Sequence, residues 1–256
     1  MNHSVWRDRG VLVVGATSAI AEATMRLLAK QGARLALVGR DGPRLEAIAA
    51  DLRVRGAGLA TTQVMDLVEA EPSQAMLGEI AGALGGFDVV LIAHGVLGDQ
   101  QQALKDSLQA ARIIDANFTS AALWALASTQ YLESINARDG VVATLGSVAG
   151  DRGRNANFIY GAAKAGLGVL MQGLAHRAAL TGGPRAMVFK LGFVDTPMTA
   201  GFKKGGPLWA KPEAIAEVIV RGLLGRSAIV YAPWFWRYII LAIRLLPQSV
   251  IGRINI

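Results

Sequence analysis

The 256-residue sequence has no cysteine, only three histidines, and no aspartate or glutamate after Glu217. The absence of cysteine excludes disulfide bonds and thiol catalysis, and it removes the usual zinc-binding patterns. The histidines, His3, His94 and His176, are too scattered to indicate a metal centre. Although 52% of the residues are apolar, no uncharged apolar run reaches about eighteen residues, so a membrane-spanning helix is not expected.

The first residues, MNHSVWRDRG, lack the apolar segment of a secretory signal, which predicts a cytoplasmic protein. The net charge is +7, and the C-terminal part carries an excess of arginines: Arg221, Arg226, Arg237, Arg244 and Arg253. This concentration favours an anionic surface or ligand near the C-terminus. Nucleic acid is not the expected partner, because these arginines alternate with large aliphatic residues instead of forming a polar stripe.

Short apolar runs alternate with longer segments of helical period along the chain. The expected strands are residues 10–15, 33–39, 59–65, 87–93, 140–146, 185–191 and 227–232. The expected helices are residues 18–31, 43–54, 72–84, 100–136, 157–180 and 212–224. Strands that are apolar on both faces and alternate with helices predict a doubly wound α/β fold with a parallel seven-stranded sheet. This domain is expected at residues 1–232, followed by a C-terminal amphipathic helical tail at residues 233–256.

The first strand-to-helix turn, VVGATSAIAEA, is the place where a Rossmann-type fold binds a dinucleotide pyrophosphate. Gly15 is the only glycine in this loop, and Ala19 and Ala21 occupy places where further glycines are expected. Alanine adds one methyl group where the backbone approaches phosphate. Thr17 and Ser18 supply hydroxyls that can cap the helix and donate to phosphate oxygens. An ordinary tight turn is the alternative interpretation.

The end of the second expected strand favours NADP(H) over NAD(H). An acidic residue there would bind the ribose 2′-hydroxyl, whereas an arginine accommodates a 2′-phosphate. Gly39 takes the strand-terminal position and Arg40 follows it. The adjacent Asp41 keeps NAD(H) open, and a solvated loop cation is the alternative for Arg40.

A serine, a tyrosine and a lysine form the candidate catalytic group. Ser147 ends the fifth expected strand, and YGAAK places Tyr160 and Lys164 four residues apart on one helix face. A lysine ammonium one turn away lowers the pKa of a tyrosine from its usual value of about 10. Ser147 can orient a carbonyl oxygen toward the phenol. The pattern predicts a carbonyl reductase in which Tyr160 is the acid.

With these motifs, the sequence resembles the short-chain dehydrogenase/reductase family over about residues 8–232. The resemblance implies that Ser147, Tyr160 and Lys164 are catalytic. It also implies a fourth member, Asn117 in DANFTSA, which holds a proton-relay water in the family, and an oligomer of two or four subunits. The implied cofactor contacts come from the family's motifs: Gly15, Thr17, Ser18, Ala19, Ile20, Arg40, Asp66, Leu67, Ala93, His94, Gly95, Tyr160, Lys164, Gly192, Val194 and Thr196.

The chain departs from the family's pattern at Ala19, Ala21, Ala93 and Leu191. These departures bear on the geometry and affinity of cofactor binding and not on the catalytic group. The segment IAHG keeps the glycine of the family's NNAG motif at Gly95, but both asparagines are gone. We interpret His94 as a structural substitute or a cofactor contact.

Basic residues on two loops predict an anionic group, such as a phosphate, on the substrate. Arg152 and Arg154 in DRGRN follow the catalytic strand, and Lys203 and Lys204 lie in TAGFKKGGPLWAK, where this fold places its substrate lid. Solvated loop charges are the alternative interpretation for all four.

The tail at residues 234–246 would form a helix about 20 Å long, too short to cross a hydrocarbon core of about 30 Å. Its aromatic and aliphatic residues, together with Arg237 and Arg244, are typical of a helix lying in the headgroup region of an anionic leaflet. We therefore expect peripheral binding to the inner face of the plasma membrane. A contact with a second subunit is the alternative.

Within the family, GATSAIA, SVAGDRGR and the PWFWR tail look like decaprenylphosphoryl-2-keto-erythro-pentose reductases. This resemblance implies NADPH-dependent reduction of a polyprenyl-phosphate keto-sugar, a lipid-like anionic substrate. Two alternatives remain open: a reductase of another membrane-dissolved ketone, and a non-catalytic scaffold that senses a dinucleotide.

Overall fold

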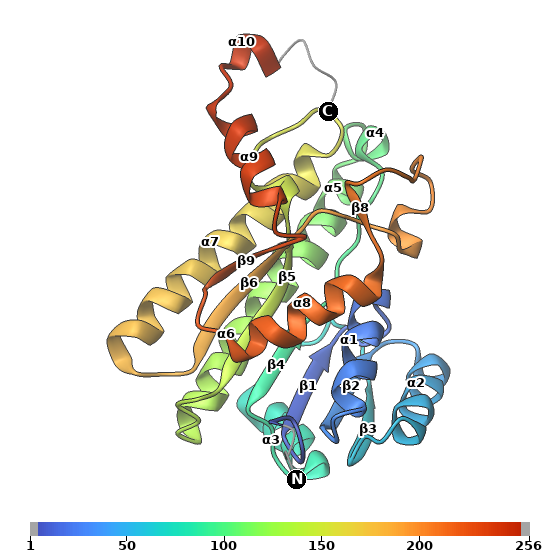
Figure 1. The fold of residues 1–256 in the computed structure, drawn as a ribbon, viewed down its shortest axis with the longest axis vertical. Coiled ribbons are helices and arrows are strands. Elements are labelled where there is room, and N and C mark those ends of the chain that lie inside the picture. Colours follow the sequence, from blue (N-terminus) through green and yellow to red (C-terminus); the bar gives the residue numbers. More distant parts are fainter. Residues whose placement is uncertain (1–4, 252–256) are drawn as a thin grey trace.

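The computed structural model describes residues 5–251 and is built around a sheet of seven parallel strands (Figure 1). The strand order is β3-β2-β1-β4-β5-β6-β9. These strands are β1 (Gly10–Val14), β2 (Arg34–Gly39), β3 (Leu59–Val64), β4 (Val89–Ile92), β5 (Val141–Ser147), β6 (Arg185–Leu191) and β9 (Ile229–Ala232). Each lies within two residues of an expected strand, and the predicted doubly wound sheet is confirmed.

Alternate residues of each strand contribute to two apolar cores, one on each face of the sheet. Val11 and Val13 of β1 pack with α1, α2 and α8, whereas Leu12 and Val14 pack with α3, α6 and α7. These helices are α1 (Ala19–Ala29), α2 (Gly42–Val54), α3 (Gln74–Leu84), α6 (Ser120–Ser134), α7 (Phe158–Thr181) and α8 (Pro212–Leu224). Burial on both faces explains why β1 is apolar throughout.

The segment expected to be one helix at residues 100–136 is divided. It forms α4 (Gln100–Ala103), α5 (Ser107–Ile114), a π-helical turn η1 (Asp115–Thr119) and then α6. The Asp106 carboxylate accepts a hydrogen bond from the Leu108 amide at 2.9 Å and caps α5, so a new helix begins there. The prediction of one continuous helix was wrong because apolar periodicity continues across this capping residue.

Helix α7 is, among residues 5–251, the one helix with the length and mean hydropathy to cross a bilayer. It is nevertheless part of the core, since Leu167 and Met171 are buried against the sheet. The helix also packs along β6 and along η2 (Val148–Gly150), a short 3-10 turn. This arrangement brings the first turns of α7 to the carboxyl end of β5.

The chain after β9 forms α9 (Trp236–Leu245) and α10 (Gln248–Ile251). Trp236 and Ile240 of α9 are buried in a small apolar cluster with Val148, Phe193 and Tyr231. Phe193 belongs to a two-stranded parallel sheet, β7 (Phe193–Val194) and β8 (Trp209–Ala210), whose connection contains the short turn η3 (Pro197–Thr199). The expected tail helix is thus present and packs on the main fold, while Arg253 lies outside the described residues.

Candidate active site

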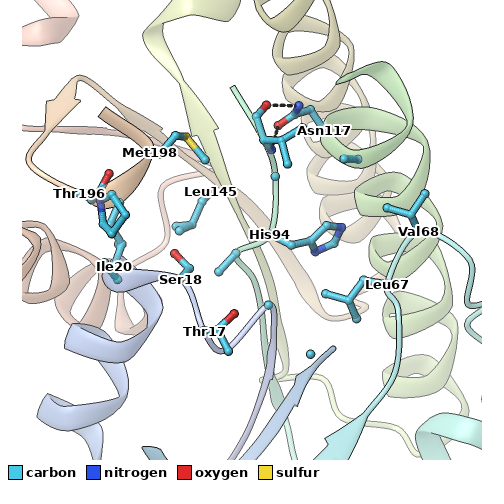
Figure 2. Close-up of a pocket in the computed structure, with 18 of the residues that line it drawn as sticks. Thr17, Ser18, Ile20, Leu67, Val68, His94, Asn117, Leu145, Thr196 and Met198 are labelled. Carbon is cyan, nitrogen blue, oxygen red and sulfur yellow. Dashed lines mark hydrogen bonds between the residues drawn. The ribbon is translucent and has the colours of Figure 1, made fainter. Parts of the chain in front are cut away.

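A cavity of about 380 Å³ opens where β1, β4 and β5 end. Because β1 and β4 are neighbours in the sheet but not in the chain, their loops leave in opposite directions and open a crevice between them. The lining includes most of the expected cofactor residues: Gly15, Thr17, Ser18, Ala19, Ile20, Arg40, Asp66, Leu67, Ala93, His94, Gly95, Tyr160, Lys164 and Thr196. Figure 2 shows Thr17, Ser18, Leu145 and Thr196 around this space.

Gly15 closes the first turn and could not be another residue. Its φ of +88° suits glycine, and a Cβ here would lie 2.6 Å from the backbone nitrogen of His94. Ser18 occupies the N-cap position of α1, but its side chain makes no capping hydrogen bond. The Ser18 hydroxyl and the start of α1 are therefore available to a ligand group in the cavity.

Arg40 and Asp41 follow β2 and have different surroundings. Arg40 is exposed and lines the cavity beside Gly39. The Asp41 carboxylate accepts a hydrogen bond from the Arg44 amide at 3.0 Å and caps α2. The acidic side chain is thus engaged by its own helix, and the arginine faces the cavity.

His94 is held in place by a side chain that sequence reasoning missed. Its Nε2 lies 2.9 Å from the Ser120 hydroxyl, and that hydroxyl donates to the Leu67 carbonyl at 2.5 Å. In Figure 2 the His94 ring turns toward Leu67 and Val68. Burial, followed by the positive charge of Lys164, lowers the pKa of His94 to about 4. His94 is therefore neutral at physiological pH and joins the ends of β3, β4 and α6.

Tyr160 and Lys164 lie one turn apart at the start of α7, as the spacing predicts. The Lys164 ammonium is 5.8 Å from the centre of the Tyr160 ring and donates a hydrogen bond to the Leu145 carbonyl at 3.0 Å. The Ser147 oxygen accepts a hydrogen bond from the Ala149 amide at 3.1 Å, which leaves its own hydrogen to donate. Ser147, Tyr160 and Lys164 thus meet at the carboxyl end of β5.

The pKa of Tyr160 is raised in the structure, in contrast to the lowering expected from Lys164. Burial is the largest cause of this shift, while a hydrogen bond with Ser147 and the charge of Arg154 act in the opposite direction. Burial also lowers the pKa of Lys164 to about 8. The Lys164 ammonium points to a backbone carbonyl instead of the phenol, so desolvation outweighs charge attraction at Tyr160.

Asn117 lies in the π-helical turn η1 and is fully buried. Its Nδ2 donates to the carbonyls of Val96 at 2.6 Å and Ile113 at 2.8 Å, and its Oδ1 accepts from the Val96 amide at 3.3 Å. A Cβ on Gly95 would lie 2.5 Å from Asn117 Oδ1 and 3.3 Å from Lys164 Nζ. The amide thus fixes the segment after β4 beside Lys164, and its role in a proton relay stays a prediction.

Two expected cofactor residues face elsewhere. A Cβ on Gly192 would lie 1.9 Å from Trp236 Nε1, so this glycine is covered by α9. The Val194 side chain is buried in the apolar core. Gly192 and Val194 therefore pack against other parts of the chain, whereas Thr196 lines the cavity.

The four basic residues expected to bind the substrate have different surroundings. Arg152 donates to the Arg244 carbonyl at 3.1 Å, the Leu246 carbonyl at 3.3 Å and Gln248 Oε1 at 3.1 Å, so it binds the tail. Lys204 forms an ion pair with Asp195. Lys203 is exposed.

Arg154 is half-buried, and its charge acts on Tyr160, which places it at the catalytic end of the cavity. The expectation that Arg152 faces the substrate was wrong, because the sequence does not show that α9 ends beside it with unpaired carbonyls.

Several residues that line the cavity were missed from the sequence: Val68, Val96, Ala116, Leu145, Gly146, Pro197 and Met198. Of these, Leu145 and Gly146 lie at the carboxyl end of β5, which is a usable signal in a fold whose ligands bind at that edge. Met198 lies in η3, just before the lid loop, and carries no such signal.

Residues 9–205 match the family model for short chain dehydrogenases. An uncharacterized oxidoreductase of Streptomyces coelicolor, described as lying in the mprA 5′ region, is 38% identical over 96% of each chain. An uncharacterized oxidoreductase of Mycobacterium tuberculosis is 34% identical over 94% of each chain.

Solved structures with the same fold share less sequence with this chain. An actinorhodin polyketide ketoreductase variant with NADPH has a TM-score of 0.76 at 21% identity and covers 88% of this chain and 95% of its own. A putative short-chain alcohol dehydrogenase of Sinorhizobium meliloti has a TM-score of 0.78 at 22% identity over 91% of this chain and 97% of its own. These similarities concern the fold alone.

Proposed function

The chain belongs to the short chain dehydrogenase family and is an oxidoreductase acting on a CH–OH/ketone pair, and we propose that it reduces a ketone with NADPH. The observation that carries this proposal is the meeting of Ser147, Tyr160 and Lys164 at the carboxyl end of β5, where Tyr160 and Lys164 line the cavity. The solved ketoreductase of similar fold, which is described with NADPH, adds support to this choice of reductant.

The cavity fits a nicotinamide dinucleotide. Gly15 allows backbone to approach a pyrophosphate, and the Ser18 hydroxyl lies at the start of α1 without a capping hydrogen bond. Asp66 lines the cavity beside Leu67, where the family resemblance places the adenine. These residues would hold the dinucleotide, and Tyr160 and Lys164 line the same cavity.

The preference for NADPH over NADH is supported by the surroundings of Arg40. A 2′-phosphate needs a cation at the end of β2, and Arg40 lines the cavity there. Binding of a ribose 2′-hydroxyl needs a free carboxylate, and the Asp41 carboxylate caps α2 instead. The arrangement therefore favours the phosphorylated cofactor.

The chemistry follows from the protonation states of three side chains. NADPH, when bound, supplies the hydride that reduces the carbonyl carbon. The Ser147 hydroxyl donates to the carbonyl oxygen, and the Tyr160 hydroxyl gives its proton to that oxygen as the alcohol forms. The raised pKa keeps Tyr160 protonated before this step. The Lys164 ammonium stabilises the phenolate that remains, and solvent restores its proton.

We also propose that the ketone is carried by an anionic lipid, such as a polyprenyl-phosphate keto-sugar. Arg154, whose charge acts on Tyr160, and the exposed Lys203 of the lid support an anionic group on the substrate. The exposed apolar side chains of Phe202 and Leu208 in the lid, and of Met198 just before it, support a lipid chain beside it. Arg152 and Lys204 contribute less, because both already bind groups of the protein.

Loss of nicotinamide absorbance in a screen of ketones with NADPH and NADH tests the reaction. We expect turnover with NADPH that is abolished in Tyr160→Phe. Replacement of Arg154 by Ala should raise KM for a phosphate-bearing ketone at least about tenfold and leave KM for a neutral ketone unchanged. Equal KM effects on both ketones would contradict the anionic substrate. Full biological function of Tyr160→Phe without turnover would favour the non-catalytic scaffold.

A further inference from the structure

Helix α9 has two faces of opposite character, and only one of them packs on the protein. Trp236 and Ile240 are buried on the first face. The opposite face carries the exposed side chains of Tyr238, Leu241 and Leu245, and the exposed Trp234, in the turn before α9, has its ring 6.0 Å from that of Tyr238. Their spacing of four, three and four residues places them on a single stripe. A stripe of large apolar side chains in water is unfavourable unless something covers it.

Arginines lie along one edge of this stripe. Arg237 and Arg244 are both exposed and seven residues apart, so they lie on the same side of α9. The chain has no aspartate or glutamate after Glu217 that could neutralise them from the same segment. An apolar stripe bordered by cations is complementary to a bilayer surface with anionic headgroups.

We propose that the α9 stripe, defined by Trp234, Tyr238, Leu241 and Leu245, binds an anionic bilayer surface in the plane of the membrane. The inference does not depend on the reaction. A second copy of this chain fits less well, because a two-fold contact would bring Arg237 and Arg244 toward their own equivalents without acidic partners. One face of a ten-residue helix is also much smaller than the roughly 800 Å² per partner of a stable interface.

Helix α9 also contacts segments of the chain that lie next to the active site. Trp236 lies on Gly192, next to the segment that leads to the cavity residue Thr196. Arg152, five residues after Ser147, binds the carbonyl groups at the end of α9. Figure 1 shows α9 and α10 beyond the end of the sheet where β5 and β6 finish. A membrane bound at the α9 stripe would therefore lie near the catalytic end of the molecule.

Sedimentation with vesicles, without cofactor or substrate, tests the proposal. We expect the full chain to bind vesicles containing phosphatidylglycerol more tightly than vesicles of phosphatidylcholine alone. This difference in affinity should be smaller for Arg237→Ala/Arg244→Ala, because two cations that attract the anionic headgroups are removed. The double variant Leu241→Glu/Leu245→Glu should bind at least about tenfold more weakly, because two apolar side chains no longer enter the headgroup region. The matched control Val54→Glu/Leu224→Glu adds the same charge at exposed apolar positions on α2 and α8 and should bind like the wild type.

Tryptophan fluorescence gives a second, local measurement. Trp234 is 70% exposed, whereas Trp209 is half-buried and Trp6, Trp124 and Trp236 are buried. Brominated lipid should quench the emission of the wild type, and Trp234→Phe should lose most of this quenching while still sedimenting with vesicles. Equal vesicle binding by Leu241→Glu/Leu245→Glu would overturn the proposal. The proposal would also be overturned if the wild type did not bind vesicles and instead formed an oligomer that dissociates in Leu241→Glu/Leu245→Glu. A second copy of the chain would then cover the stripe.

Discussion

The indole of Trp236 lies directly on Gly192, so closely that a Cβ on this glycine would stand 1.9 Å from the indole nitrogen. Gly192 follows β6, the strand beside catalytic strand β5, and Trp236 belongs to the tail helix. The contact therefore joins the tail to the edge of the sheet where the site is built.

Gly192→Ala should displace Trp236 and loosen α9. We expect the free energy of unfolding to fall by about 1–3 kcal/mol, as in other overpacked cores, with a loss of protease resistance in the tail. The control is Gly82→Ala on α3, where a Cβ meets nothing within 4 Å. Denaturant unfolding of both variants measures the difference, and equal stability of the two would contradict the packing described here.

Arg152 acts on the tail and not on the substrate. Arg152→Ala removes hydrogen bonds to the Arg244 and Leu246 carbonyls and to Gln248 Oε1. It should lower the free energy of unfolding by about 1–2 kcal/mol, because hydrogen bonds from a charged donor are lost. KM for a phosphate-bearing ketone should stay unchanged, in contrast to Arg154→Ala. A rise in KM for Arg152→Ala without a change in the free energy of unfolding would mean that Arg152 binds the substrate.

Arg40→Ala should change cofactor choice. Removal of the guanidinium that suits a 2′-phosphate should weaken NADPH binding about 10- to 100-fold and leave NADH binding unaltered. Dissociation constants from titration of each dinucleotide test this, with NADH as the internal control. If the binding of both dinucleotides weakened equally, Arg40 would support the loop and would not bind the 2′-phosphate.

Stability should depend on pH through His94, whose pKa is lowered to about 4 by burial and by Lys164. The unfolded chain binds a proton at a pKa of about 6.5, and the folded chain binds it only near 4. Stability is therefore fully present above pH about 6.5 and is lost as pH falls toward 4, by about 3 kcal/mol. His94→Asn should remove this part of the acid dependence, as measured by unfolding at several pH values. An unchanged slope in the variant would contradict the assignment.

Activity should depend on pH through Lys164, whose pKa is lowered to about 8 by burial. The ammonium form stabilises the phenolate of Tyr160, so kcat/KM for reduction should fall as pH rises through about 8. A pH profile of kcat/KM tests this, because that ratio reports groups of the free enzyme. A profile that stays flat well above pH 8 would mean that Lys164 keeps its proton or plays no part.

Much of the fold could be predicted from the sequence because the central strands are apolar on both faces and bounded by turn residues. Val11 to Val14 are buried on two sides, and a short apolar run of this kind is typical of a strand inside a parallel sheet. The break before α5 was missed because Asp106 looks like any polar residue on a helix until its carboxylate is seen to cap Leu108. The apolar periodicity favours one continuous helix there, whereas the Asp106 cap favours a new helix, and the structure has the new helix.

The candidate site could be predicted where a residue's role follows from its spacing, as for Tyr160 and Lys164. Roles that depend on distant partners could not. Arg152 reaches carbonyl groups more than ninety positions away, and Ser120 links His94 to Leu67 across the sheet edge. The pKa of Tyr160 also depends on burial by the whole fold, which spacing alone does not measure.

We propose that Tyr160 supplies the proton while the rest of the cavity binds the dinucleotide. The most direct test of this role is the single-turnover rate of ketone reduction by Tyr160→Phe, measured with NADPH bound. Loss of a general acid predicts a rate about a thousandfold slower with the dissociation constant for NADPH unchanged. A variant that reduces the ketone at the wild-type rate would contradict the account.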